Sequence, residues 1–140
     1  MNDTLRYERK FRIEHEHVGS VMSILASQPA LFREVYSERW INNIYLDDQL
    51  FSAVSSNVAG LAERKKLRVR WYGDLEGQID RPVLEYKMRH GVVGSKASFP
   101  MPPCRIPDDA APPRFAAIAR RADLPDDVRL ELLKLRPVLL

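Results

Sequence analysis

Residues 66–72 read KLRVRWY, a stretch that alternates strictly between polar and apolar side chains. Successive side chains of a β-strand point to opposite faces of a sheet, so a period of two sorts them into two rows. One row is mostly cationic and the other is apolar: Lys66, Arg68, Arg70 and Tyr72 against Leu67, Val69 and Trp71. The stretch therefore predicts a strand with one buried face and one cationic face.

Two other stretches have the same pattern. Residues 84–89 (LEYKMR) place Glu85, Lys87 and Arg89 opposite three apolar side chains, and residues 5–14 (LRYERKFRIE) place charges at every even position. A single strand of this kind is usually the solvent-exposed face of an antiparallel sheet. Three together, rich in cations with a few carboxylates, favour a surface for a polyanion and its metal ion.

The bulk composition is that of a folded protein with one domain. The chain has 140 residues, 45% of them hydrophobic and 29% charged, with a net charge of +3. It has one cysteine, Cys104, so an internal disulfide is impossible. No apolar run approaches membrane-spanning length and no signal peptide opens the chain, so we expect a cytoplasmic protein.

Hydrophobic spacing predicts further elements along the chain. Strands are expected at residues 39–46, 64–72, 82–89 and 92–99, and helices at 16–27, 49–62, 114–121 and 124–136. Six prolines between residues 100 and 113 predict a rigid surface linker over 101–113, followed by a helical segment over 114–137. The chain ends in an apolar run that begins like a strand, so we expect a fragment or a truncated gene product.

Four motifs occur in order: RYERKF at 6–11, YLDD at 45–48, KLRVRWYG at 66–73 and LEYK at 84–87. Together they resemble the amino-terminal half of the VTC domain. That family is the polyphosphate polymerase branch of the CYTH-like triphosphate tunnel metalloenzymes. The resemblance covers residues 4–100 and extends loosely over the helical stretch.

The resemblance implies an α+β fold with half of an antiparallel β-tunnel. Residues 1–100 would form its four or five strands, with a charged concave face and helices packed outside. The full domain would transfer the terminal phosphate of ATP to polyphosphate, and a fragment would be inactive alone. No catalytic residue is assigned. Phosphates would be bound by Arg6, Lys10, Arg68, Arg70, Lys87 and Lys96.

Two glutamates match the family's charged strands. Glu8 and Glu85 would face the tunnel, either as ligands of Mn²⁺ or Mg²⁺ or as partners that orient the cations. Tyr45 and Asp47 match the second-strand signature, and we assign them no role.

The chain departs from its relatives in two respects. The cyclase and thiamine triphosphatase branch opens with glutamates two residues apart, and Arg6 stands at the first of these positions. This favours the polymerase branch. The family's second half, with further tunnel strands, is missing, and a closed barrel needs about eight strands. Two copies of the chain, or a second chain, could complete the tunnel.

Two alternatives to an enzyme domain stay open. The half-tunnel could bind polyphosphate, triphosphate or a nucleotide without turning it over. The cations and aromatic residues also permit a nucleic-acid-binding protein, but carboxylates interleaved on the cationic faces would repel a phosphodiester backbone. Nucleic acid is therefore the less favoured partner.

Overall fold

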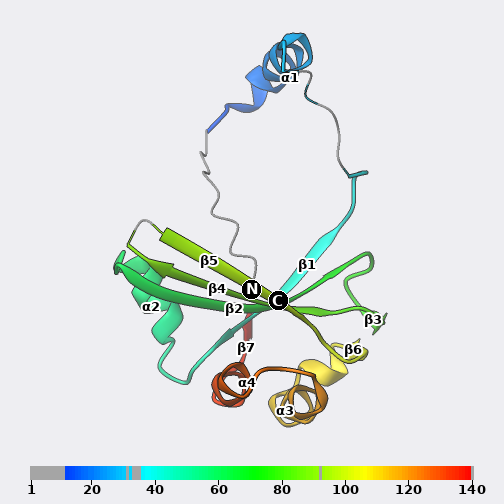
Figure 1. Cartoon of the computed structure of the whole chain (residues 1–140). Helices are drawn as coiled ribbons and strands as arrows, with labels where there is room; N and C mark the ends of the chain where they lie inside the picture. Colours follow the sequence, from blue (N-terminus) through cyan, green and yellow to red (C-terminus); the bar gives the residue numbers. More distant parts are fainter. Residues whose placement is uncertain (1–11, 31, 33–35, 92, 140) are drawn as a thin grey trace. The chain divides into compact units, whose positions relative to one another are not determined.

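The computed structural model of the chain describes residues 12–30, 32, 36–91 and 93–139 (Figure 1). The chain divides into two compact units, Met1–Leu5 with Arg39–Leu140, and Arg6–Glu38. In the smaller unit a 3₁₀ turn, η1 (His15–His17), leads into α1 (Val18–Ser27), which confirms the helix predicted at 16–27. Of the strand predicted at 5–14, residues 12–14 are not in a strand, and residues 5–11 lie outside the described part.

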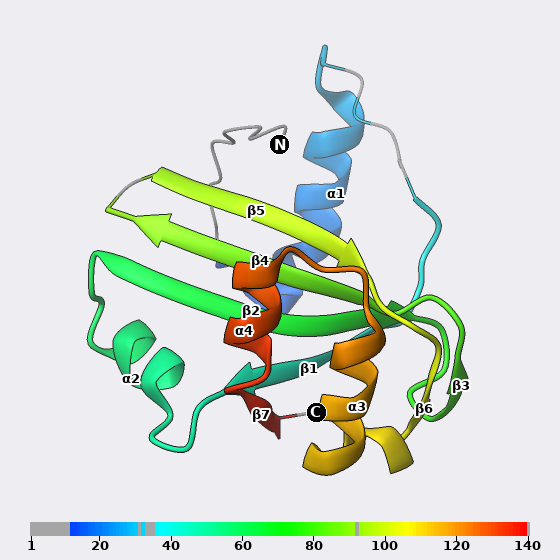
Figure 2. The same ribbon diagram turned by 60° about the horizontal axis from the view of Figure 1, so that its bottom comes forward.

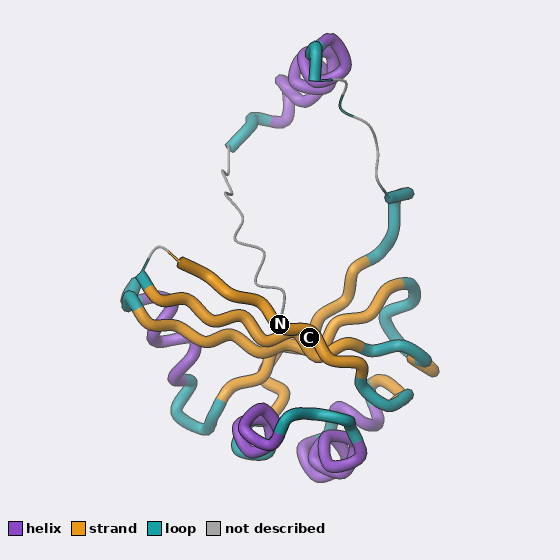
Figure 3. Tube along the Cα trace, viewed as in Figure 1, coloured by secondary structure: helices purple, strands orange, loops and turns teal. Residues whose placement is uncertain are grey.

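The larger unit is built on an open antiparallel sheet, which has five strands among the described residues (Figure 3). Its order is β5-β4-β2-β1-β7, and it does not close into a barrel. The strands are β1 (Ile41–Asp47), β2 (Glu63–Tyr72), β4 (Val83–His90), β5 (Val93–Pro100) and β7 (Arg136–Leu139). The α+β class and the strands predicted at 39–46, 64–72, 82–89 and 92–99 are confirmed.

Two helices, α3 (Pro112–Arg121) and α4 (Asp126–Leu132), cover one face of this sheet (Figure 2). The apolar rows of the strands meet the apolar faces of these helices and form one core. Removing this apolar surface from water is the main favourable contribution to folding. The central members are Ile44, Leu46, Leu67, Val69, Trp71, Leu84, Phe115, Ile118 and Leu132, all buried.

Two residues of the proline-rich stretch are buried in this core, so the prediction that residues 101–113 lie on the surface as a linker is wrong for that part of it. Within it, β6 (Cys104–Ile106) pairs with β3 (Gly77–Ile79) in a second, two-stranded sheet. Met101 and Ile106 are 6% and 4% exposed. Proline lacks an N–H donor but is tolerated in short strands and edge strands. Apolar residues next to the prolines can therefore still be buried.

The turn after β1 is organised by two carboxylates. Asp47, which is 2% exposed, accepts hydrogen bonds from the backbone N–H groups of Asp48, Ala53 and Val54 at 2.9–3.0 Å. Asp48 accepts those of Leu50 and Ser52 at 2.9 and 3.0 Å. These bonds satisfy the orphan donors at the start of α2 (Ser52–Val58), which is shorter than the helix predicted at 49–62.

The described helices are all short. The longest, α1 and α3, have 10 residues each. Within the described residues, none is both long and apolar enough to cross a bilayer.

Candidate functional site

The sheet face opposite α3 and α4 carries a dense group of cations, called the cationic face below. The register pairs Lys66 with Lys87, Arg68 with Glu85 and Arg64 with Arg89 across β2 and β4, and Lys87 with Lys96 across β4 and β5. Since Leu67 and Val69 face the core, their neighbours in β2 point the other way. On β2, β4 and β5 this face bears seven cations and one carboxylate: Arg64, Lys66, Arg68, Arg70, Lys87, Arg89 and Lys96, and Glu85.

Glu85 is the centre of a charged cluster on this face. Its side chain is 8% exposed, because long cationic side chains surround it. Oxygen Oε2 accepts from Arg68 Nε at 2.7 Å and lies 2.6 Å from Arg68 Nη2. Oxygen Oε1 accepts from Lys96 Nζ at 2.6 Å and from Arg70 Nη1 at 3.5 Å. One carboxylate therefore holds three cations from two strands, β2 and β5.

Two polar side chains of β1 extend the cluster. Arg70 Nε donates to Asn43 Oδ1 at 2.9 Å, and Arg68 Nη1 donates to the Tyr45 hydroxyl at 3.4 Å. The Lys66 ammonium lies 4.6 Å from the centre of the Tyr45 ring, a cation–π contact. These contacts fix both guanidinium groups, which lowers the entropic cost of arranging them around a ligand.

A row of lysines lies next to this cluster. Lys66, Lys87 and Lys96 are direct register neighbours across β2, β4 and β5. Like charges directly opposite on a sheet repel each other. Lys96 binds Glu85, whereas Lys66 and Lys87 form no ion pair with any described carboxylate. An anion bound to this row would relieve the repulsion.

The charges of the cluster shift its pKa values. Burial by itself would raise the pKa of Glu85, but hydrogen bonds from Lys96 and Arg68 and the charges of Arg68 and Arg70 outweigh it and lower that pKa. Burial would also raise the pKa of Tyr45, but the bond from Arg68 and the nearby cations lower it. Burial opposes the charged form of Arg68, yet its bonds to Tyr45 and Glu85 raise its pKa. The network therefore keeps both the carboxylate and the guanidinium charged.

The structure brings together most of the predicted site residues that it describes. Arg68, Arg70, Lys96 and Glu85 are in direct contact, and Lys87 is one register row away on the same face. Arg6, Glu8 and Lys10 lie outside the described residues.

Sequence reasoning left three residues of this face without a role. Asn43 and Tyr45 contact the arginines, and Lys66 contacts Tyr45. Tyr45 was visible as part of a family motif. Asn43 had no signal of its own, because its place beside Arg70 depends on the β1–β2 register.

The described residues do not by themselves form a divalent-ion site at Glu85. Mg²⁺ and Mn²⁺ require several oxygen ligands. Both oxygens of Glu85 already accept from cations, and no group of three or more Asp, Glu, His or Cys side chains suited to a metal occurs in the described part of the chain. Glu85 has the geometry of a partner that orients cations. The metal-ligand role of Glu8 and Glu85 stays a prediction.

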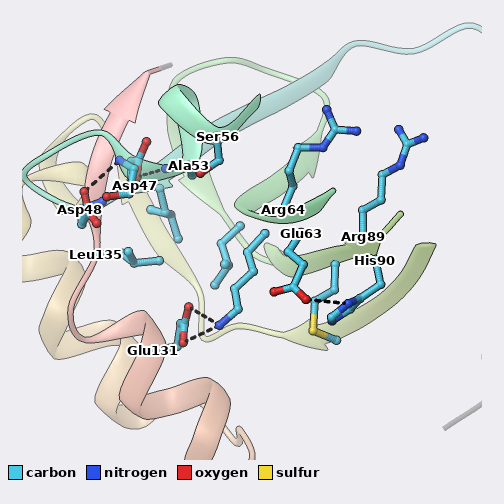
Figure 4. Close-up of a pocket in the computed structure, with 15 residues that line it drawn as sticks. Asp47, Asp48, Ala53, Ser56, Glu63, Arg64, Arg89, His90, Glu131 and Leu135 are labelled. Atoms are coloured by element: carbon cyan, nitrogen blue, oxygen red, sulfur yellow. Dashed lines mark hydrogen bonds and ion pairs between the residues drawn. The ribbon is translucent and has the colours of Figure 1, made fainter. Parts of the chain in front are cut away.

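A pocket of about 310 Å³ lies on the helix side of the sheet (Figure 4). Leu46, Leu67, Met88 and Leu135 are among its lining residues. Its charges are balanced: Lys65 pairs with Glu131 at 3.2 Å, and Glu63 with His90 at 3.2 Å. Arg64 and Arg89 also line the pocket, but Figure 4 shows their side chains extending away from Glu131. A polyanion is therefore better matched by the cationic face than by this pocket.

Comparison with known proteins identifies the family. A family model described as the VTC domain matches residues 5–124, which is most of the chain and includes the cationic face. No curated protein and no solved structure matches the chain. The chain therefore belongs to the VTC domain family.

Proposed function

We propose that the cationic face binds the phosphates of polyphosphate and ATP, and that the complete domain transfers the terminal phosphate of ATP to polyphosphate. The observation that carries the proposal is the seven-to-one ratio of cations to carboxylates on the cationic face of the neighbouring strands β2, β4 and β5. Membership of the VTC family, whose members include polyphosphate polymerases, supports the same reading.

The chemistry of phosphoryl transfer suits such a face. The reaction depends on positioning the reactants and on neutralising their charge more than on covalent help from the protein. An arginine offers a planar fork that can bind two phosphate oxygens at once, and of the two arginines Arg70 is held less tightly by Glu85 than Arg68 is, while Lys87 and Lys96 act as point charges. The attraction between fixed cations and a phosphate is stronger still in a site that excludes water, because the effective dielectric constant falls.

Binding is the part of this function that the described residues support by themselves. The sheet is open, and its cations could hold a polyphosphate chain without turning it over. Transfer inside a closed tunnel would need more strands than this open sheet provides. A non-catalytic binding module for polyphosphate or triphosphate is therefore the second candidate.

The first experiment is a thermal melt with sodium tripolyphosphate at low and at high salt. Tripolyphosphate should raise the melting temperature, and the shift should shrink as salt screens the cations. Arg68→Ala and Arg70→Ala should reduce the shift, whereas Arg114→Ala, on α3, should not. No shift at low salt would refute the proposal.

Two further assays separate the candidates. Synthesis of long-chain polyphosphate from ATP with Mn²⁺ would identify the polymerase and would exclude a purely non-catalytic binding module. Competition between tripolyphosphate and single-stranded RNA tests the nucleic-acid alternative. RNA binding as strong as tripolyphosphate binding would favour that alternative.

A further inference from the structure

The single carboxylate that the described strands β2, β4 and β5 place on the cationic face stands where an anionic ligand would bind. Glu85 takes up contacts from Arg68, Arg70 and Lys96 that phosphate oxygens would otherwise receive. A bound phosphate must share these cations with Glu85 or exchange with it. Glu85 is therefore both an orienting partner and a competitor.

The two oxygens of Glu85 differ in how firmly they are held. Oε2 receives two nitrogens of Arg68, at 2.6 and 2.7 Å. Oε1 receives Lys96 at 2.6 Å and Arg70 at the longer distance of 3.5 Å. The Lys96 side chain is 39% exposed, and those of Arg68 and Arg70 are 26% and 19% exposed. Lys96 is thus the partner most free to turn toward a ligand.

Within the described part of the chain, the neighbouring lysine row has no such competitor. Lys66 and Lys87 form no ion pair with a described carboxylate, and Lys96 is their register neighbour although its ammonium binds Glu85. The lysine row and the row of Arg68 and Glu85 are two residues apart along β2, about 7 Å. A single phosphate can occupy the lysine row alone, whereas a longer chain reaches the Glu85 cluster.

We infer that Glu85 is a displaceable internal counter-ion that makes the affinity of the cationic face depend on the chain length of its phosphate ligand. This inference rests on the proposed function. A short ligand binds Lys66 and Lys87 and leaves Glu85 in place. A longer ligand draws Lys96, and then Arg70, away from Oε1, while Arg68 stays on Oε2. Glu85 is a specificity-determining residue in this scheme and takes no part in bond making.

The test is a titration of orthophosphate, pyrophosphate and tripolyphosphate into the full chain and its Glu85→Gln variant. This substitution keeps the shape of the side chain and removes its charge, so tripolyphosphate should bind about tenfold more tightly, the effect of one close charge. Orthophosphate affinity should change by less than about twofold, because its site is one row away and screened. The change in affinity for pyrophosphate should lie between those for orthophosphate and tripolyphosphate.

Two variants control for charge and fold. Glu63→Gln makes the same change in net charge on the same sheet, but Glu63 lies on the other face and pairs with His90. It should leave all three affinities nearly unchanged. Lys96→Gln removes the shared cation and keeps the test available if Glu85→Gln does not fold. It should weaken tripolyphosphate binding more than orthophosphate binding.

The outcomes are distinct. The inference is supported if Glu85→Gln tightens binding by a factor that grows with the chain length of the phosphate, and Glu63→Gln does not. Equal tightening at every length, equal tightening in Glu63→Gln, or weaker binding at every length would overturn it, since Glu85 would then act only through net charge or orientation. If the wild-type chain binds none of the three ligands, the proposed function itself fails.

Discussion

Arg68 and Glu85 are register partners on β2 and β4, and two guanidinium nitrogens of Arg68 reach the same carboxylate oxygen, Nε at 2.7 Å and Nη2 at 2.6 Å. The second oxygen is thereby left for Lys96 and Arg70. This division of one carboxylate between a firm and a shared contact determines both the stability of the cationic face and its response to a ligand.

Replacing Arg68 should destabilise the fold. Arg68→Met leaves oxygen Oε2 of the nearly buried Glu85 without its partner, and we expect the free energy of unfolding to fall by about 2 kcal/mol. Arg68→Lys should recover only part of this lost stability, because an ammonium group cannot offer two nitrogens in a plane. Urea denaturation measures both variants. Arg89→Met, at an exposed position on the same face, is the control, and an equal loss there would contradict this account.

Acid should weaken the fold through Glu85. Its folded-state pKa lies below the ordinary value of 4.5, so its contribution to stability is complete above 4.5 and is lost as the pH falls through the lower folded value. The stability difference between the wild type and Glu85→Gln should be large at neutral pH and should narrow well below pH 4.5. Urea melts across this range measure it. A difference independent of pH would show that Glu85 is not held in its charged form.

The turn between β1 and α2 should depend on Asp47. Asp47→Ala removes the buried carboxylate that accepts three hydrogen bonds from backbone N–H groups. We expect the free energy of unfolding to fall by about 2–3 kcal/mol. Asp47→Asn keeps one acceptor oxygen and should lose less. Hydrogen exchange should accelerate at Ala53 and Val54, whose N–H groups Asp47 binds. Unchanged exchange at these two residues would argue against a capping role.

The proline-rich stretch should behave as core. Ile106→Ala should lower the free energy of unfolding by about 2–4 kcal/mol, because Ile106 is 4% exposed and packs in the main cluster. Leu130→Ala is the matched control, since Leu130 is 61% exposed on α4. Thermal or urea unfolding distinguishes the two. A negligible loss for Ile106→Ala would restore the surface-linker interpretation.

Local alternation was enough to predict the central strands and their two faces. The side-chain period of a strand depends only on backbone geometry and not on strand pairing. The alternation therefore places Arg68 and Arg70 of KLRVRWY on one face, and Glu85 and Lys87 of LEYKMR on one face. The burial of Leu67, Val69, Trp71 and Leu84 confirms that sorting. The pattern failed for residues 101–113, because proline density describes backbone stiffness and does not show which side chains are buried.

The sequence by itself therefore determined which side chains share a face, and through its motifs the family. The tertiary structure alone decided which of them touch. Asn43 meets Arg70, and Lys96 shares Glu85 with Arg68, only because strand register aligns residues far apart in the chain. Register is set by turns, core packing and the pairing of whole strands, which act over distances that a local pattern does not encode.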